Sequence, residues 1–95
     1  NRISNLEPLA KLTQIKYLYL GNNRIVRVDS LKNMKNLVAL DLSANQVTDL
    51  SPLYGLVKLE TIGLYDNVNL TQEEIKQLQK VLPSCTINHN IGKNR

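Results

Sequence analysis

Few side chains in this chain could take part in covalent chemistry. Its single cysteine and single histidine, Cys85 and His89, stand four positions apart. A catalytic thiol and its base must lie on one face within hydrogen-bond distance of each other. Two residues four positions apart, where a strand passes into a turn, are not expected to share a face. One Cys with one His also cannot complete a zinc site. Glycine-rich phosphate loops, G-x-S-x-G motifs and paired carboxylates in a pocket are not recognisable. We therefore expect a protein that is not an enzyme and has neither a metal nor another cofactor.

Side chains suited to recognition are better represented. All four aromatic residues are tyrosines, and Tyr17, Tyr19 and Tyr65 lie in or beside segments that alternate like strands. Tyrosine offers a large contact area, few rotatable bonds and one hydroxyl, and is enriched in protein interfaces. Asp41 and Asp66 occur among small residues in the same segments. We predict a protein-binding surface made by Tyr17, Tyr19, Asp41, Thr61, Tyr65, Asp66 and His89. The alternative is that Tyr17 and Tyr19 merely suit strand geometry.

The elements that position these side chains follow from an internal repeat. Asparagine recurs every 22 residues, at Asn1, Asn23, Asn45 and Asn67, and seven aliphatic columns recur in the same register. One such coil cannot bury its own apolar side, whereas stacked coils share a continuous sheet and core. Each Asn follows a strand where the chain turns inward, so its amide can satisfy backbone groups that the turn leaves unpaired. The four asparagines are therefore predicted to form a structural ladder without a role in binding.

Each coil is predicted to contain one strand and one helical turn. The strands are expected over 17–20, 39–42 and 61–64, and the turns over 9–12, 31–34 and 53–56 on the opposite, convex side. The outward strand positions then form two columns across the concave side of the sheet. These columns are Tyr19, Asp41, Gly63 and Thr86, and Tyr17, Ala39, Thr61 and Ser84.

The repeat gives way near residue 70 to a unit that we interpret as a C-terminal cap. Thr71 and Glu74 form a capping box, in which Thr71 accepts from the Glu74 backbone N–H and the Glu74 side chain reaches back. A helix is expected over about 72–82, with Ile75, Leu78, Val81 and Leu82 buried and Pro83 ending it. A last strand is expected over about 84–88 with Cys85 facing inward as a small buried hydrophobe. The predicted organisation is repeats over 1–69 and a cap with a tail over 70–95.

The other end carries no comparable device. Asn1 occupies the ladder position after a strand that is not in the sequence, so the first coil is expected to leave Ile3, Leu6 and Leu9 facing water or a neighbour. This pattern predicts that the chain is the C-terminal part of a longer repeat protein. Its partner would then be another protein, or the N-terminal repeats of its own chain.

Composition narrows the class of protein further. The chain has 95 residues, of which 42% are hydrophobic, with no Phe or Trp and a net charge of +4. This apolar fraction excludes a disordered tail, and no apolar run approaches the roughly 18 residues of a membrane helix, so membrane insertion is not expected. Basic residues fall on the predicted flank and back without interleaved aromatics, so nucleic acid is not an expected partner. Among them, Arg27 is expected to pair with Asp49 on the next coil.

The repeat L-x-x-L-x-x-L-x-L-x-x-N-x-I-x-x-L-x-x-L resembles that of leucine-rich repeats. Its period, together with Pro8 and Pro52 before Leu9 and Leu53, is similar to the 22-residue class of bacterial internalins and of a eukaryotic phosphatase regulator. The resemblance implies an α/β fold: a right-handed solenoid with a parallel sheet on the concave face and short helical turns on the convex face. It also implies protein recognition, either at a bacterial surface or after secretion, or as an intracellular regulator in the cytoplasm.

Overall fold

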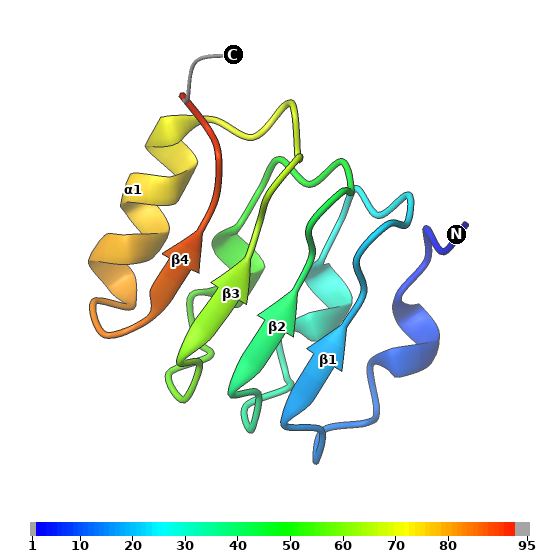
Figure 1. Cartoon of the computed structure of the whole chain (residues 1–95). Helices are drawn as coiled ribbons and strands as arrows, with labels where there is room; N and C mark the ends of the chain where they lie inside the picture. Colours follow the sequence, from blue (N-terminus) through cyan, green and yellow to red (C-terminus); the bar gives the residue numbers. More distant parts are fainter. Residues whose placement is uncertain (1, 93–95) are drawn as a thin grey trace.

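The computed structural model of the chain describes residues 2–92, so the predictions for Asn1 and for the tail at 93–95 lie outside the described residues. Short 3-10 helices alternate with short strands, and an α-helix and a last strand follow (Figure 1). The elements are η1 Glu7–Leu9, β1 Tyr17–Tyr19, η2 Asp29–Leu31, β2 Ala39–Asp41, η3 Ser51–Leu53, β3 Thr61–Gly63, α1 Gln72–Val81 and β4 Thr86–Asn88.

The strands form one parallel sheet in the order β1-β2-β3-β4, which is also their order in the chain (Figure 1). Tyr19 pairs with Asp41 and Asp41 with Gly63, so each step across the first three strands equals the 22-residue period. A chain that returns to the next position after each period is a solenoid, and the predicted fold class is confirmed. The helical turns begin two residues earlier than expected, although i→i+3 bonds also reach Leu12, Met34 and Leu56.

The core consists of the aliphatic columns of the second and third coils. Every member is at most 4% exposed: Ile25, Val28, Leu31, Met34, Leu37, Leu40 and Leu42 in one coil, and Val47, Leu50, Leu53, Leu56, Leu59, Ile62 and Leu64 in the next. Neighbouring strands of a sheet lie only about 4.8 Å apart, so each layer of this interior is one slim side chain thick. This spacing explains a core without Phe or Trp.

The first coil is only partly buried. Ile3 and Leu12 are exposed and Leu9 is half-buried, whereas Leu6 is buried, so the expectation of exposure is wrong for Leu6. Leu6 directly precedes η1, and η1 contacts η2. Leu6 therefore belongs to the same apolar cluster as the residues of the second coil. One side of this coil therefore covers the core, and the other side carries the exposed Ile3 and Leu12.

The asparagines bond the coils to one another. The Asn45 amide group donates to the carbonyl oxygens of Leu42 and Ser43, in its own coil, at 3.1 and 3.2 Å. It also donates to the carbonyl oxygen of Leu20 in the preceding coil at 2.9 Å. The Asn45 oxygen accepts from the backbone N–H of Ile25, again in the preceding coil, at 2.9 Å. Asn67 makes the same set of bonds one coil later, and both side chains are buried.

The residue before each of Asn23, Asn45 and Asn67 has a left-handed backbone conformation. Asn22, Ala44 and Asp66 have φ of 61°, 59° and 60°. This conformation turns the chain from the strand into the interior, and Asn and Asp tolerate it better than a residue such as Ala. The turn and the amide after it therefore act as one unit in each coil.

The last helix is bonded to the third coil through Glu74. Thr71 caps the helix as expected, because its Oγ1 accepts from the Glu74 backbone N–H at 3.2 Å. The Glu74 carboxylate does not complete the predicted capping box but accepts instead from the backbone N–H of Leu50, at 3.0 Å. Val81 is exposed rather than buried, so Ile75, Leu78 and Leu82 alone form the apolar stripe.

Loss of one ladder asparagine should be costly. Asn67→Ala would leave the buried backbone N–H of Val47 and the carbonyl oxygen of Leu64 without their amide partner, so we expect a loss of about 3 kcal/mol in unfolding free energy. Urea unfolding measures it. Exposed Asn69→Ala is the matched control and should change stability by less than about 0.5 kcal/mol. Equal effects of the two substitutions would contradict the ladder.

The Glu74 contact can be tested separately from helix capping. Glu74→Gln keeps an oxygen acceptor for the Leu50 N–H and should be nearly neutral, whereas Glu74→Ala should cost about 1–3 kcal/mol. Thr71→Ala, which removes only the cap, should cost about 1 kcal/mol. Equal stabilities of the Gln and Ala variants in thermal or urea unfolding would show that the Leu50 contact contributes nothing.

Candidate functional site

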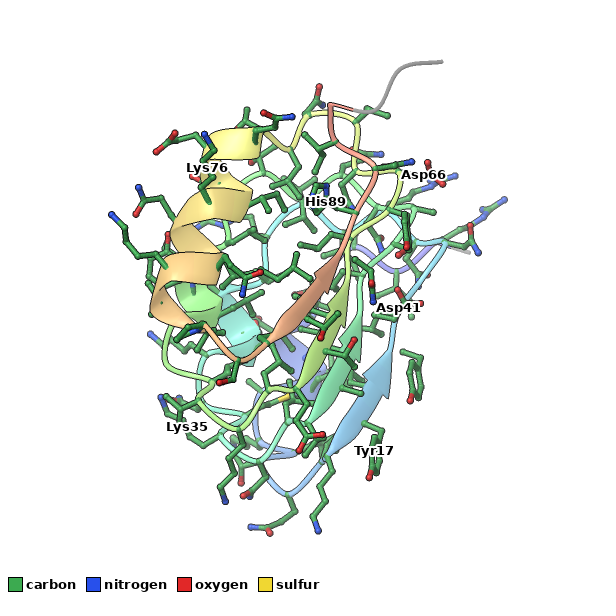
Figure 2. All side chains as sticks on the ribbon, turned by 60° about the vertical axis from the view of Figure 1, so that its left-hand side comes forward. Tyr17, Lys35, Asp41, Asp66, Lys76 and His89 are labelled. Atoms are coloured by element: carbon green, nitrogen blue, oxygen red, sulfur yellow. The ribbon has the colours of Figure 1, made fainter. Side chains whose placement is uncertain are left out.

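The outward side chains of the strands form the concave face, a surface of three columns. The first column is Tyr17, Ala39, Thr61 and Thr86, and the second is Tyr19, Asp41, Gly63 and Asn88. The third follows the strand ends and comprises Gly21, Ser43 and Tyr65. Tyr17, Tyr19 and Tyr65 are 60%, 68% and 45% exposed, the largest aromatic exposure in residues 2–92. Figure 2 shows Tyr17 and Asp41 on the side of the sheet away from α1.

The last strand, Thr86–Asn88, lies within the predicted range 84–88, but its predicted register is wrong by two residues. Thr86, not Ser84, pairs with Thr61, and Asn88, not Thr86, pairs with Gly63. The step from β3 to β4 is 25 residues because the chain between them contains α1 in place of a short turn. A shift of two leaves the alternation of inward and outward residues unchanged, and Cys85 is buried as expected. The corrected register brings Asn88 onto the concave face.

Asp41 lies at the centre of this face, in a slot that glycines keep open. A Cβ on Gly63 would lie 2.5 Å from Asp41 Oδ1, and one on Gly21 would lie 3.2 Å from Oδ2. Neither glycine has a positive φ, so the missing side chain, and not backbone freedom, is what the site uses. Asp41 Oδ1 accepts from the Ser43 backbone N–H at 3.1 Å, and Ser43 Oγ accepts from the Tyr65 N–H at 3.1 Å.

A shallow depression of about 320 Å³ surrounds the Asp41 carboxylate. Its lining includes Tyr19, Asp41, Thr61 and Tyr65, so the fold brings together four of the seven residues predicted from the sequence. Tyr17 stands beside this depression, paired with Ala39 of its lining.

Asp66 lies apart from that depression. Its Oδ1 accepts from Asn90 Nδ2 at 2.8 Å, and its backbone N–H donates to Asn90 Oδ1 at 3.0 Å. It lines a different hollow, together with Val68, Leu70 and Ile91. The reciprocal bonds tie the segment after β4 to the turn after β3, and they occupy part of the carboxylate that was predicted to face a partner.

His89 does not lie on the concave face. It follows Asn88, which pairs with Gly63, so its position corresponds to that of the inward Leu64. Figure 2 shows His89 on the side of the sheet that carries α1. Its Nδ1 accepts from the Ile91 backbone N–H at 3.1 Å. The prediction that His89 contacts a partner on the rim is therefore corrected, and the cause is the register of β4.

Two polar residues of the depression were not among the predicted site residues. Ser43 shares the repeat column of Gly21 and Tyr65, so the 22-residue spacing alone could have identified it. Asn88 donates from Nδ2 to Thr61 Oγ1 at 3.4 Å. Its position depends on the path around α1, and no spacing in the sequence reveals it.

Positive charge is kept off the concave face. Its three columns contain no Lys or Arg among the described residues, and Asp41 is their only carboxylate. Arg27 pairs with Asp29 at 3.2 Å and not with Asp49 as predicted. The hydrogen bond that Arg27 donates to Asp29 lowers the pKa of Asp29, and the same bond raises the pKa of Arg27. Both side chains are exposed, so this pair contributes little to stability.

Cys85 and Tyr54 have ordinary structural environments. Burial raises the pKa of the Cys85 thiol, which lies in the core cluster. Tyr54 packs half-buried against the convex side of the core. Within residues 2–92, no group of three or more His, Cys, Asp or Glu side chains is arranged to hold a metal ion. In the same range, no helix has the length and apolar character needed to cross a membrane.

Comparison with known proteins places these features in a family context. The leucine rich repeat family model matches residues 13–68. A probable U2 small nuclear ribonucleoprotein A' of Drosophila melanogaster is 32% identical over 82 residues, which are 81% of this chain and 31% of that protein.

Solved structures agree with this match. An internalin (inlF) of Listeria monocytogenes superposes with a TM-score of 0.84 at 27% identity, over 96% of this chain and 27% of the other. Internalin C2 of the same species gives 0.81 at 32% identity, over 96% and 40% of the two chains. The Drosophila SNF/U2A' complex gives 0.66 at 31% identity, over 88% and 50%. This chain thus spans half or less of each of these four proteins.

The glycine slot can be tested by a double-mutant cycle. Gly63→Ala should displace the Asp41 carboxylate from Ser43 and cost about 1 kcal/mol, whereas in an Asp41→Ala background the same change should be neutral or stabilising. Urea unfolding of the four proteins gives the coupling. Gly55→Ala, whose added Cβ meets only Lys35 Nζ, is the control and should not couple to Asp41. Absence of coupling between positions 63 and 41 would contradict the slot.

Proposed function

Because the chain belongs to the leucine-rich repeat family, whose members are protein-interaction modules, we propose that it binds a protein partner through the concave face. Tyr17, Tyr19, Asp41, Thr61 and Tyr65 are the proposed contact residues. Ser43, from the repeat column of Tyr65, and Asn88, from the corrected register of β4, are added to them. Its architecture is internalin-like, as the TM-scores of 0.84 and 0.81 indicate. We extend the proposal to a bacterial surface or secreted protein, with an intracellular role like that of a ribonucleoprotein component as the alternative setting.

The exposed tyrosines are the observation that carries this proposal. Tyr17 and Tyr19 are neighbours on one edge strand, and Tyr65 stands across the depression from them. The parts of these three rings that are exposed to water contribute no hydrophobic stabilisation to the folded chain. The same rings supply rigid contact area in a complex, where one such residue can contribute about 2 kcal/mol.

A second candidate role is supported by the exposed apolar side chains of the first coil. Ile3 and Leu12 occupy columns that are buried in the next two coils, and Asn23 is only half-buried where Asn45 and Asn67 are buried. These features fit a coil that is covered by another coil. On this reading the segment completes a longer solenoid, and the binding surface lies elsewhere.

Quantitative capture from an extract of the source organism tests the proposal. The bait is the chain, or the longer protein that contains it, and it is compared with a Tyr17→Ser, Tyr19→Ser, Tyr65→Ser variant. The matched control is Val26→Ser, Val57→Ser, Val68→Ser, which removes three exposed apolar side chains outside the concave face.

We expect a protein that the wild type and the valine variant retain equally and that the tyrosine variant loses by at least about tenfold, a difference of about 1.4 kcal/mol. Far-UV circular dichroism and the melting temperature must be unchanged in the tyrosine variant. Equal retention by all three baits would reject the concave face and favour the structural role.

A further inference from the structure

We propose that the Asp41 slot receives an arginine side chain of the protein partner. The inference rests on the proposed function and adds the chemistry of the contact. It depends on the charge of the concave face, the access to the carboxylate, and the aromatic rings beside it.

The charge of the face is opposite to that of the whole chain. The chain has 12 Lys and Arg against 8 Asp and Glu. The three columns of the concave face nevertheless hold one carboxylate and, within the described residues, no cation. No side chain of the face itself can therefore neutralise Asp41, so a positively charged group from outside is attracted to it.

The carboxylate is accessible because its neighbours are small. Side chains at positions 21 and 63 would contact its two oxygens, and both positions are glycine. Ala39, two residues before Asp41 on β2, is also small and lines the same depression. The Ser43 N–H occupies one acceptor site of Oδ1, and a carboxylate offers about four such sites. Enough remain for a donor with two N–H groups.

The rings favour a guanidinium over an ammonium group. Tyr19 is the strand partner of Asp41, and Tyr65 lines the opposite part of the same depression. A guanidinium is planar, donates two parallel hydrogen bonds to a carboxylate and stacks on aromatic faces. Lysine provides a compact charge without that geometry. A pocket with one carboxylate between two tyrosines thus matches arginine in both charge and shape.

A second aspartate in the chain shows that the slot is not a requirement of local structure. Asp49 occurs in the same tripeptide, Asp-Leu-Ser, and its Oδ1 accepts from the Ser51 N–H at 3.0 Å, as Asp41 does from Ser43 at 3.1 Å. Asp49 has this turn without a glycine slot, and the aromatic ring near it, Tyr54, packs half-buried on the convex side. Asp41→Asn and Asp49→Asn therefore remove the same charge, and each keeps an oxygen for the local bond.

The probe is N-acetyl-arginine amide, which is titrated into the 15N-labelled chain. Its binding is measured from the changes in the backbone amide chemical shifts. N-acetyl-citrulline amide, which has the same shape without the charge, and the corresponding lysine derivative are titrated in parallel. We expect saturable shifts at Asp41, Ser43, Gly63 and Tyr65 with arginine. Affinity should be at least about fivefold lower with lysine and with Asp41→Asn, and unchanged with Asp49→Asn. Citrulline should produce no saturable shift.

Several outcomes would overturn the inference. They are arginine shifts at Asp41 no larger than those at Asp49, equal binding of citrulline, lysine binding as tightly as arginine, and undiminished binding to Asp41→Asn. None of them affects the capture experiment, because loss of a protein partner in the tyrosine variant does not depend on what enters the slot. Conversely, arginine binding without that loss would leave the slot as a site for a cation and reject the concave face as the docking surface.

Discussion

The burial of backbone polar groups where each coil turns inward is the constraint on which this fold depends. A turn that carries the chain from a strand into an apolar interior leaves carbonyl and N–H groups that water cannot reach, and each unsatisfied group costs about 1–3 kcal/mol. Asn45 and Asn67 satisfy groups of their own coil and of the coil before it. The same side chain thus closes one turn and fixes the distance to the next, so the coils stack with one repeat length.

In the regular stack of coils, the side chains of the concave face are not needed to fill the core. Packing is completed by the inward columns and the asparagines, so the outward columns of the sheet can vary without cost to the core. Tyr17, Tyr19 and Tyr65 stand exposed there, and Asp41 is flanked by Gly21 and Gly63. The arrangement follows from small and large side chains alternating across neighbouring strands, which only a fixed register can maintain.

Regularity ends where α1 replaces a helical turn. The longer path shifts β4 by two residues, which leaves Cys85 buried, brings Asn88 to the concave face and directs His89 to the inward side. Glu74 and the Asp66–Asn90 pair bond this irregular unit to the third coil through contacts that no repeat position shares. The parts of the site predicted wrongly from the sequence all depend on this unit.

The sequence by itself determined the coil, the aliphatic core and the columns of the first three strands, because an uninterrupted period of 22 residues places equivalent residues side by side. It also identified the exposed tyrosines, since alternation along a strand separates inward from outward positions. Only the tertiary structure decided which residues of the last unit meet the sheet, and that Asp41 rests between two glycines. The physical reason is that the last unit shares no period with the repeats, so its contacts are set by how the chain packs around α1. Asp41 and Gly63 do share a column, but the direction of the Asp41 side chain depends on its contacts in the folded sheet.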